Sequence, residues 1–230
     1  MKKTLLIISL LAGMVMSGEA QTKNMRFGLK MGPSFDWASS GSTVVNNYGL
    51  RLGYGAGLVV DRYFSDQIAV SSGLELNYLR MRYEFTDHRR VEDFLEETDV
   101  VVMRKIKATN LEIPIKIKVG REIMDIFRAY VEAGVGLGVN LQDRGMDSYD
   151  LYWVSYEGDS YVDCTDQYRL LQVSMVFGLG AEYEINRNLS LFAQLKFDHA
   201  FSNAFNSSFE KQTGSILRNN FFGIEVGALY

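Results

Sequence analysis

The sequence predicts an all-β fold, an eight-stranded antiparallel up-and-down transmembrane β-barrel. Eight segments alternate apolar residues with polar or small ones, at the period of two that is typical of a β-strand. The connections alternate between long and short, which predicts four long extracellular loops and three short periplasmic turns. The last segment, 219–230, carries no polar tail, as expected of the strand that closes a barrel in lipid.

The alternation places the strands in order along the chain. The first strand puts Phe27 and Leu29 on one face and Lys30 on the other, and later segments repeat this division. The alternation slips near Ala108 and Thr109, which predicts a β-bulge. Short turns are expected at 64–67, 120–127 and 186–188, and long connections at 38–47, 84–99, 142–167 and 202–218. The predicted strands are 26–37, 49–61, 68–83, 100–119, 128–141, 168–185, 189–201 and 219–230.

Residues 1–20 have the pattern of a cleaved secretory signal peptide. Lys2 and Lys3 precede a short apolar run at 5–16, and small residues stand at Gly18 and Ala20. No later run of 18 apolar residues exists, so a transmembrane helix is not expected. We therefore expect export and cleavage of 1–20, with residues 21–230 forming one barrel domain in the bacterial outer membrane.

Composition excludes several classes of function. The full chain has a net charge of −4, and removal of 1–20 brings it to about −5. A mildly acidic chain lacks the basic surface that the nucleic-acid backbone requires, so no nucleic-acid partner is expected. Cys164 is the single cysteine, which excludes an internal disulfide framework and a cysteine-based zinc site. No cofactor is expected.

The polar faces of the strands carry glycines together with charges of both signs. A barrel of eight strands has an interior only just wide enough for side chains, so small residues belong there, and buried charges must pair. A soluble lipocalin-type barrel would reverse the two faces, but the loop alternation and the apolar last strand favour the membrane barrel. The predicted lumen charge network comprises Lys30, Arg51, Glu75, Glu112, Lys116, Arg128, Glu132, Glu182, Lys196 and Glu225, with Asp36, Asp61 and Lys118 on the same face.

Catalytic chemistry has one weak candidate. His199 stands beside Asp198, but only Ser202 and Ser207 are near in sequence as nucleophiles, and a hydrolase needs a serine within hydrogen-bond reach. A histidine anchored at the membrane interface explains His199 better. We therefore expect no enzyme, and no constellation typical of a lipid-modifying enzyme is found.

The connection 142–167 mixes acidic and aromatic residues. Its carboxylates have no regular spacing for Ca²⁺, whereas tyrosine and tryptophan are common in binding hot spots. Alternatively, the flanking strands extend beyond the membrane and turn at Gly158 and Asp159. Cys164 is expected to be accessible here from outside the cell. The candidate partner-binding residues are Tyr149, Tyr152, Trp153, Tyr156 and Tyr161.

Five sequence fragments stand out by their order and spacing: FGLKMG at 27–32, SGLEL at 72–76, LEIPIKIK at 111–118, AGVGLG at 133–138 and FGLGAEY at 177–183. Together they resemble the PorT-like outer-membrane β-barrel family. This resemblance implies an eight-stranded outer-membrane barrel of a Gram-negative bacterium, and the family's named member is an accessory of a protein-secretion and gliding system.

These observations predict a non-enzymatic barrel that is envelope-structural or accessory to protein secretion or surface interaction through its loops. Its expected partners are outer-membrane lipid and other envelope or secretion-system proteins. A small porin or solute-binding barrel is the alternative, although mixed charges would plug so narrow a lumen.

Overall fold

The computed structural model describes residues 25–40, 46–47, 49–90, 97–124, 126–151, 154–186, 188–208, 210 and 216–230. The predicted signal peptide, 1–20, lies outside these residues. Within them, no helix has the length and apolar character needed to cross a membrane.

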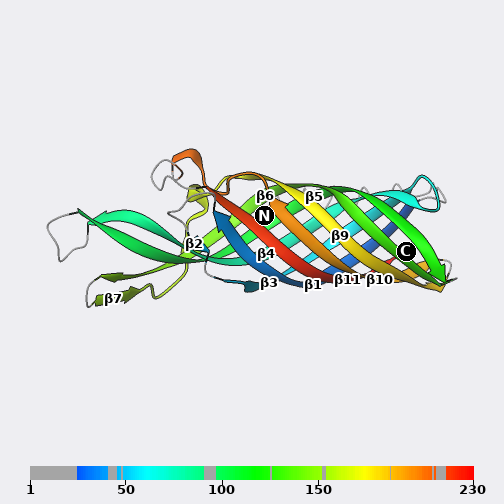
Figure 1. The fold of residues 1–230 in the computed structure, drawn as a ribbon, viewed down its shortest axis with the longest axis horizontal. Coiled ribbons are helices and arrows are strands. Elements are labelled where there is room, and N and C mark those ends of the chain that lie inside the picture. The colour runs from blue at the N-terminus through cyan, green and yellow to red at the C-terminus, as the bar shows by residue number, and fades with distance from the viewer. Residues whose placement is uncertain are drawn as a thin grey trace, which may run out of the picture.

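Eight long strands form one closed antiparallel barrel (Figure 1). Each strand pairs with the next one along the chain, and β1 pairs with β11 to complete the ring. The predicted fold class is therefore confirmed. The barrel strands are β1 (Met25–Ser40), β3 (Arg51–Tyr63), β4 (Ile68–Arg90), β5 (Glu97–Met124), β6 (Phe127–Leu151), β9 (Leu171–Asn186), β10 (Leu189–Ala200) and β11 (Leu217–Leu229).

Short secondary-structure elements lie at the end of the barrel that carries the long connections. The two-residue strand β2 (Asn46–Asn47) pairs with β4, while β7 (Val154–Glu157) and β8 (Val162–Asp163) pair with β6. A single 3₁₀ turn, η1 (Thr165–Gln167), follows β8. We call this end of the barrel the outer end.

The barrel turns its apolar side chains outward. On β1, the side chain of Leu29 is 63% exposed while its neighbour Lys30 is only 4% exposed. The same alternation in β9 and β10 gives an apolar outer belt and a polar interior. This arrangement is the reverse of a lipocalin-type barrel, whose exterior is polar. An apolar exterior is stable against lipid, so the belt marks the part of the barrel that lies in the membrane.

Three adjacent strands extend far beyond the others. The strands β4, β5 and β6 have 23, 28 and 25 residues, whereas the remaining five have 12 to 16. Together with β7 they leave the barrel as a curved sheet (Figure 1). We call this sheet the projection and define it as residues 79–90, 97–108, 143–151 and 154–157.

The projection corrects two expectations about the connections. Residues 84–90 and 97–99, predicted as loop, continue β4 and β5 as paired strands. The hairpin beyond β6 turns between Leu151 and Val154, earlier than the expected turn at Gly158 and Asp159. Sequence reasoning missed this because high charge was interpreted as loop. The predicted bulge is present, with a register shift between Thr109 and Asn110 that leaves Leu141 of β6 as the extra residue.

Candidate functional site

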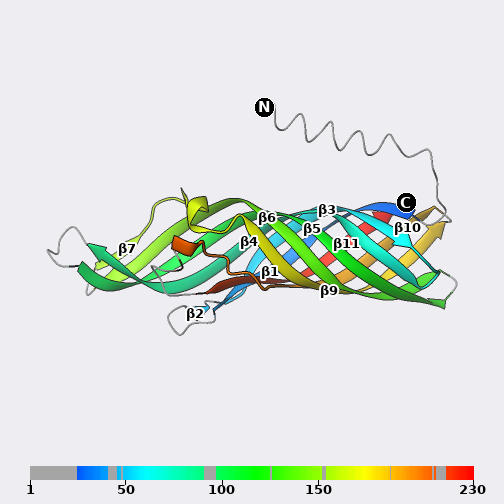
Figure 2. The ribbon, with the colours of Figure 1, turned by 90° about the horizontal axis from the view of Figure 1, so that it is seen from above.

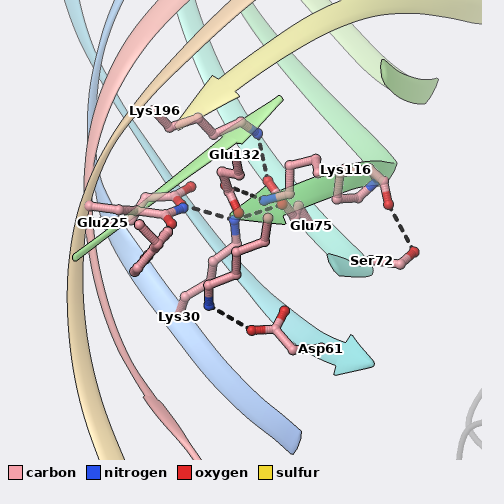
Figure 3. A network of polar contacts seen from close by, with 12 residues as sticks. Lys30, Asp61, Ser72, Glu75, Lys116, Glu132, Lys196 and Glu225 are labelled. Carbon is pink, nitrogen blue, oxygen red and sulfur yellow. Dashed lines mark hydrogen bonds and ion pairs between the residues drawn. The ribbon is translucent and has the colours of Figure 1, made fainter. Parts of the chain in front are cut away.

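The barrel interior holds a network of buried charges. The network comprises four lysines and seven carboxylates that point into the lumen from all eight barrel strands, and Figure 3 shows several of them converging. The lysines are Lys30, Lys116, Lys118 and Lys196, and the carboxylates are Asp61, Glu75, Glu112, Glu132, Glu182, Asp198 and Glu225.

Glu75 of β4 bridges two lysines, Lys30 of β1 and Lys196 of β10, and β10 lies on the opposite wall of the barrel from β4. Lys30 of β1 places its Nζ 2.6 Å from Glu75 Oε1 and 2.9 Å from Glu225 Oε2. Lys196 of β10 lies 2.6 Å from Glu75 Oε2 and 3.1 Å from Glu112 Oε1. These contacts tie β1, β4, β5, β10 and β11 together across the lumen.

A second group of ion pairs lies nearer the short turns. Lys116 Nζ is 2.5 Å from Glu132 Oε1 on the neighbouring strand β6. Lys118 Nζ is 2.7 Å from Asp61 Oδ2 of β3 and also pairs with Glu182 of β9. Because an unpaired buried charge is very costly, this pairing stabilises the interior only as a complete set.

The lumen is filled rather than open. Two cavities between the described lumen side chains have volumes of about 10 Å³ and about 20 Å³, which is room for a single water molecule in each. Glycines make space for the charged side chains, since a Cβ on Gly178 would lie 2.4 Å from Glu132 Cγ and one on Gly136 would lie 2.8 Å from Glu112 Cδ. Among the described residues, the charged side chains and these small cavities leave little room in the lumen for a solute.

Two residues predicted for the network lie outside it. Arg51 is exposed at the outer end of β3. Arg128 lies near the short turns, where its guanidinium donates to the carbonyl oxygen of Asp66 and its Cζ lies 5.0 Å from the Tyr63 ring centroid. Both stand near strand ends, where the inward face meets solvent.

Two connections fold together over the outer mouth of the barrel. We call residues 158–170 and 201–206 the cap. Tyr168 and Phe205 form an isolated β-bridge, and the Arg169 amide donates to the Ala204 carbonyl at 2.7 Å. In Figure 2 the segments around η1 and around residues 207–208 lie side by side between the barrel and the tip of the projection.

The cap packs on the inner face of the projection and forms a water-excluded outer core. In this core Tyr83 and Phe205 contact edge to face with ring centroids 5.8 Å apart, and the hydroxyls of Tyr83 and Tyr168 hydrogen-bond. The interior therefore changes from charged to apolar where the chain leaves the membrane. The outer core comprises Ala38, Leu79, Met81, Tyr83, Phe85, Val102, Ile106, Ala108, Cys164, Tyr168, Ala204, Phe205, Leu217 and Phe221.

One buried arginine joins the cap to the projection. Arg104 of β5 makes a two-point contact with Asp147 of β6, with Nε to Oδ1 at 2.5 Å and Nη2 to Oδ2 at 2.8 Å. Its Nη1 donates to Gln167 Oε1 of η1 at 2.5 Å, and its Cζ lies 4.9 Å from the Phe85 ring centroid. Such a fork fixes orientation as well as charge, so Arg104 locks η1 against the sheet.

The three candidate partner-binding aromatics that the structure describes make different contacts. Tyr149 and Tyr156 stack across the β6–β7 hairpin with ring centroids 4.9 Å apart, and Tyr156 is 49% exposed. Tyr161 lies elsewhere, with Lys107 Nζ 3.7 Å from its ring centroid. Tyr152 and Trp153 lie outside the described residues.

Cys164 lies outside the membrane but is buried. Its side chain is 6% exposed in the outer core, and burial raises the pKa of its thiol to about 12. The expectation that this thiol would react readily with an external reagent is therefore wrong for the closed cap. Its burial depends on contacts with distant segments, which the local sequence does not reveal.

The candidate catalytic residues are not brought together. The Asp198 carboxylate is buried in the lumen, where it accepts a hydrogen bond from Ser174 Oγ at 3.1 Å. His199 points the other way and lies between the rings of Phe197 and Phe201, while Ser202 Oγ accepts from the Val173 amide. Within the described part of the chain, no group of three metal-ligating side chains occurs.

Comparisons with known proteins agree with this architecture. The model of the family described as outer membrane protein beta-barrel domain matches residues 19–206. No curated protein matches the sequence at a significant level. Similar solved structures include the outer-membrane protease OmpT of Escherichia coli, which is 10% identical with a TM-score of 0.49 and coverage of 91% of this chain and 97% of that chain.

Two further solved outer-membrane proteins are similar at comparably low identity. Neisserial surface protein A is 12% identical with a TM-score of 0.43, covering 87% of this chain and 95% of that chain. The outer-membrane protein OprG of Pseudomonas aeruginosa is 11% identical with a TM-score of 0.43, covering 90% and 96%. These likenesses concern the fold alone.

Proposed function

The chain belongs to the family of outer-membrane β-barrel domains, and we propose that it is a non-enzymatic member whose sealed barrel anchors an external platform for other envelope proteins. The platform is the projection with its cap. The barrel itself contacts outer-membrane lipid through its apolar belt.

The length of three strands is the observation that carries this proposal. A strand crosses the hydrocarbon core with about 9–11 residues. The strands β4, β5 and β6 have 23, 28 and 25 residues, so each has more than ten beyond that need. At about 3.3 Å per residue, the additional strand reaches on the order of 40 Å from the membrane. An ordered sheet of that reach suits contact with another macromolecule.

The resemblance to PorT-like barrels makes a secretion apparatus one candidate partner. In that case the projection would contact a secretion-system protein. Deletion of the gene would then leave exported proteins that carry a C-terminal sorting domain in the periplasm. The alternative partner is a structural protein of the envelope, and the same deletion would leave the secreted proteins unchanged.

A shortened barrel tests the platform. Phe85 and Val102 lie opposite each other in the register, so an Asn-Gly turn in place of residues 86–101 joins them without disturbing the remaining ladder. We expect this variant to reach the outer membrane, fold to the heat-resistant compact form on gels, and lose the cross-linked partners that the full chain captures on intact cells. Full capture by the shortened barrel would contradict the proposal.

A small pore is the second candidate function, and the filled lumen argues against it. Reconstitution in planar bilayers separates the two. We expect no stable conductance steps from the full chain, because the charge network occupies the lumen. Reproducible single-channel steps would contradict a sealed barrel.

A further inference from the structure

A row of three cations crosses the outer face of the projection at its base. Arg80 of β4 is the cross-strand partner of Lys107 of β5, and Lys107 is the partner of Arg144 of β6. All three side chains are exposed, and their neighbours Leu79 and Ala108 face the outer core. We call Arg80, Lys107 and Arg144 the basic row.

The basic row lies directly above the apolar belt. Two positions toward the membrane on β4, Tyr78 stacks on Tyr54 with ring centroids 4.6 Å apart, and on β6 the exposed bulge residue Leu141 precedes Arg144 by three positions. Tyrosines mark the interface between hydrocarbon and water. The row therefore stands at the height of the lipid headgroups of the outer leaflet.

Like charges in direct cross-strand contact destabilise a sheet, so the basic row lowers the stability of the folded barrel. Neighbouring carboxylates relieve it only in part. Glu157 pairs with Lys105, one row further out, at 2.8 Å, and Asp163 is the cross-strand partner of Arg144. Within the described part of the chain, no ion pair involves Arg80, Lys107 or Arg144, although Lys107 also lies over the Tyr161 ring.

The row has the chemistry of a phosphate site. Guanidinium groups bind phosphate oxygens in a two-point fork, and the Lys107 ammonium between them adds a point charge. Arg82 of β4 is the partner of Lys105 and continues the cationic face outward. The phosphate of a lipid headgroup lies at the same height as these side chains, so it can contact them while the lipid stays in the membrane.

We propose that the basic row binds the phosphorylated headgroup of a glycolipid in the outer leaflet. The bound headgroup neutralises the row and fixes the depth of the barrel beneath the projection. This site is independent of any protein partner of the projection.

The probe for this proposal is bisphosphorylated lipid A, added to the purified barrel in neutral detergent and followed by native mass spectrometry. Each basic residue near an anionic membrane surface contributes about a fivefold factor in binding, so the double variant Arg80→Gln, Arg144→Gln should bind about 30-fold more weakly. The matched control, Arg62→Gln with Arg121→Gln, removes two exposed cations at the opposite end of the barrel and should bind within twofold of the native chain.

Two further measurements make the result decisive. Without lipid, the double variant should melt at the same temperature as the native chain or above it, because a like-charge contact is relieved. Dephosphorylated lipid A should bind the native chain as weakly as the phosphorylated form binds the double variant. Equal losses in both double variants, or binding of soluble inorganic polyphosphate as tight as that of lipid A, would overturn the proposal.

Discussion

The interior of this barrel has two chemically opposite halves. In the membrane-spanning part, inward positions hold charges such as Lys30 and Glu75, and outward positions are aliphatic. In the projection, inward positions hold residues such as Tyr83 and Phe85, and outward positions such as Arg80 are charged. A single strand, β4, carries both patterns on one continuous ladder.

This difference shows that the solvent outside decides what the interior contains. Lipid outside permits apolar side chains there, so the narrow lumen is left to polar groups that must satisfy one another. Water outside the projection restores the ordinary order, and the hydrophobic effect then drives the cap onto the sheet. The two halves should therefore respond oppositely to the removal of charge and of apolar volume.

Breaking one lumen ion pair should give the largest effect. Lys116 and Glu132 are both buried and pair at 2.5 Å, so Lys116→Met leaves a buried carboxylate without this partner and should cost about 3–5 kcal/mol. Replacing both residues by Met should recover most of that loss. Urea unfolding of the refolded barrel, followed by tryptophan fluorescence, measures both.

The matched control uses the same substitution in the other half. Lys105 forms an exposed pair with Glu157, so Lys105→Met should change stability by less than about 1 kcal/mol. Equal losses from Lys116→Met and Lys105→Met would show that the lumen pairs do not differ from surface pairs.

Removing apolar volume should affect the outer half alone. Phe205 is fully buried in the outer core, so Phe205→Ala should cost about 3 kcal/mol of cap stability. The Cys164 thiol reports cap opening, and its reaction with a maleimide should speed up about 100-fold while the urea midpoint of the barrel stays unchanged. An unchanged labelling rate would mean that the cap does not protect Cys164.

The stability of the cap should depend on pH through Asp143. This carboxyl lies above the apolar belt on β6, where Asn140 donates to it and Thr165 Oγ1 accepts from its own amide at 2.9 Å. Burial raises its pKa from 3.8 to about 7. A raised carboxyl pKa means that the closed cap binds the proton more tightly than the open one, so closure weakens as the pH rises from about 4 to about 7.

Labelling of Cys164 at a series of pH values measures this dependence. After correction for the reactivity of the unfolded chain, cap opening should increase by up to about tenfold per pH unit in that window. In Asp143→Asn the dependence should vanish. A pH profile that is the same in both proteins would assign the change to another group.

Glycine packing in the lumen should give the smallest effect. A Cβ on Gly178 would lie 2.4 Å from Glu132 Cγ, so Gly178→Ala should cost about 1–3 kcal/mol through displacement of the network. Gly138 also faces inward, but its nearest neighbour, Gln172 Cβ, would lie at 3.6 Å. Gly138→Ala should therefore be neutral or stabilise by about 0.5 kcal/mol. Equal melting temperatures for the two variants would contradict close packing around Glu132.

The alternation of the sequence predicted the eight barrel strands and most of the buried lumen charges, although Arg51 and Arg128 lie outside the network. A period of two assigns each residue to a face without knowledge of the partner strand. It does not show which charges meet, because Glu75 and Lys196 come from opposite walls and their heights depend on the stagger of the whole ring.

The outer half was harder to predict for a related reason. The alternation of β4 continues through Met81, Tyr83 and Phe85. These apolar residues, however, lie on the inward face, which is polar in the membrane-spanning part of the same strand. The high charge of 84–99 concealed this exchange. The burial of Cys164 and the Arg104 fork depend on the cap, whose two segments are far apart in the sequence.

The pairing of β1 with β11 has a consequence for the order of folding. Their register joins Gly28 to Leu229 and Ser40 to Leu217, positions at nearly opposite ends of the chain. All other neighbours in the ring are barrel strands that follow one another along the chain, so their pairing closes much shorter loops. Closing a long loop costs the most conformational entropy before any contact forms. The β1–β11 pair should therefore be the last strand pair to form. Until then both edge strands expose unpaired backbone, so the cell must protect an open sheet on its way to the membrane.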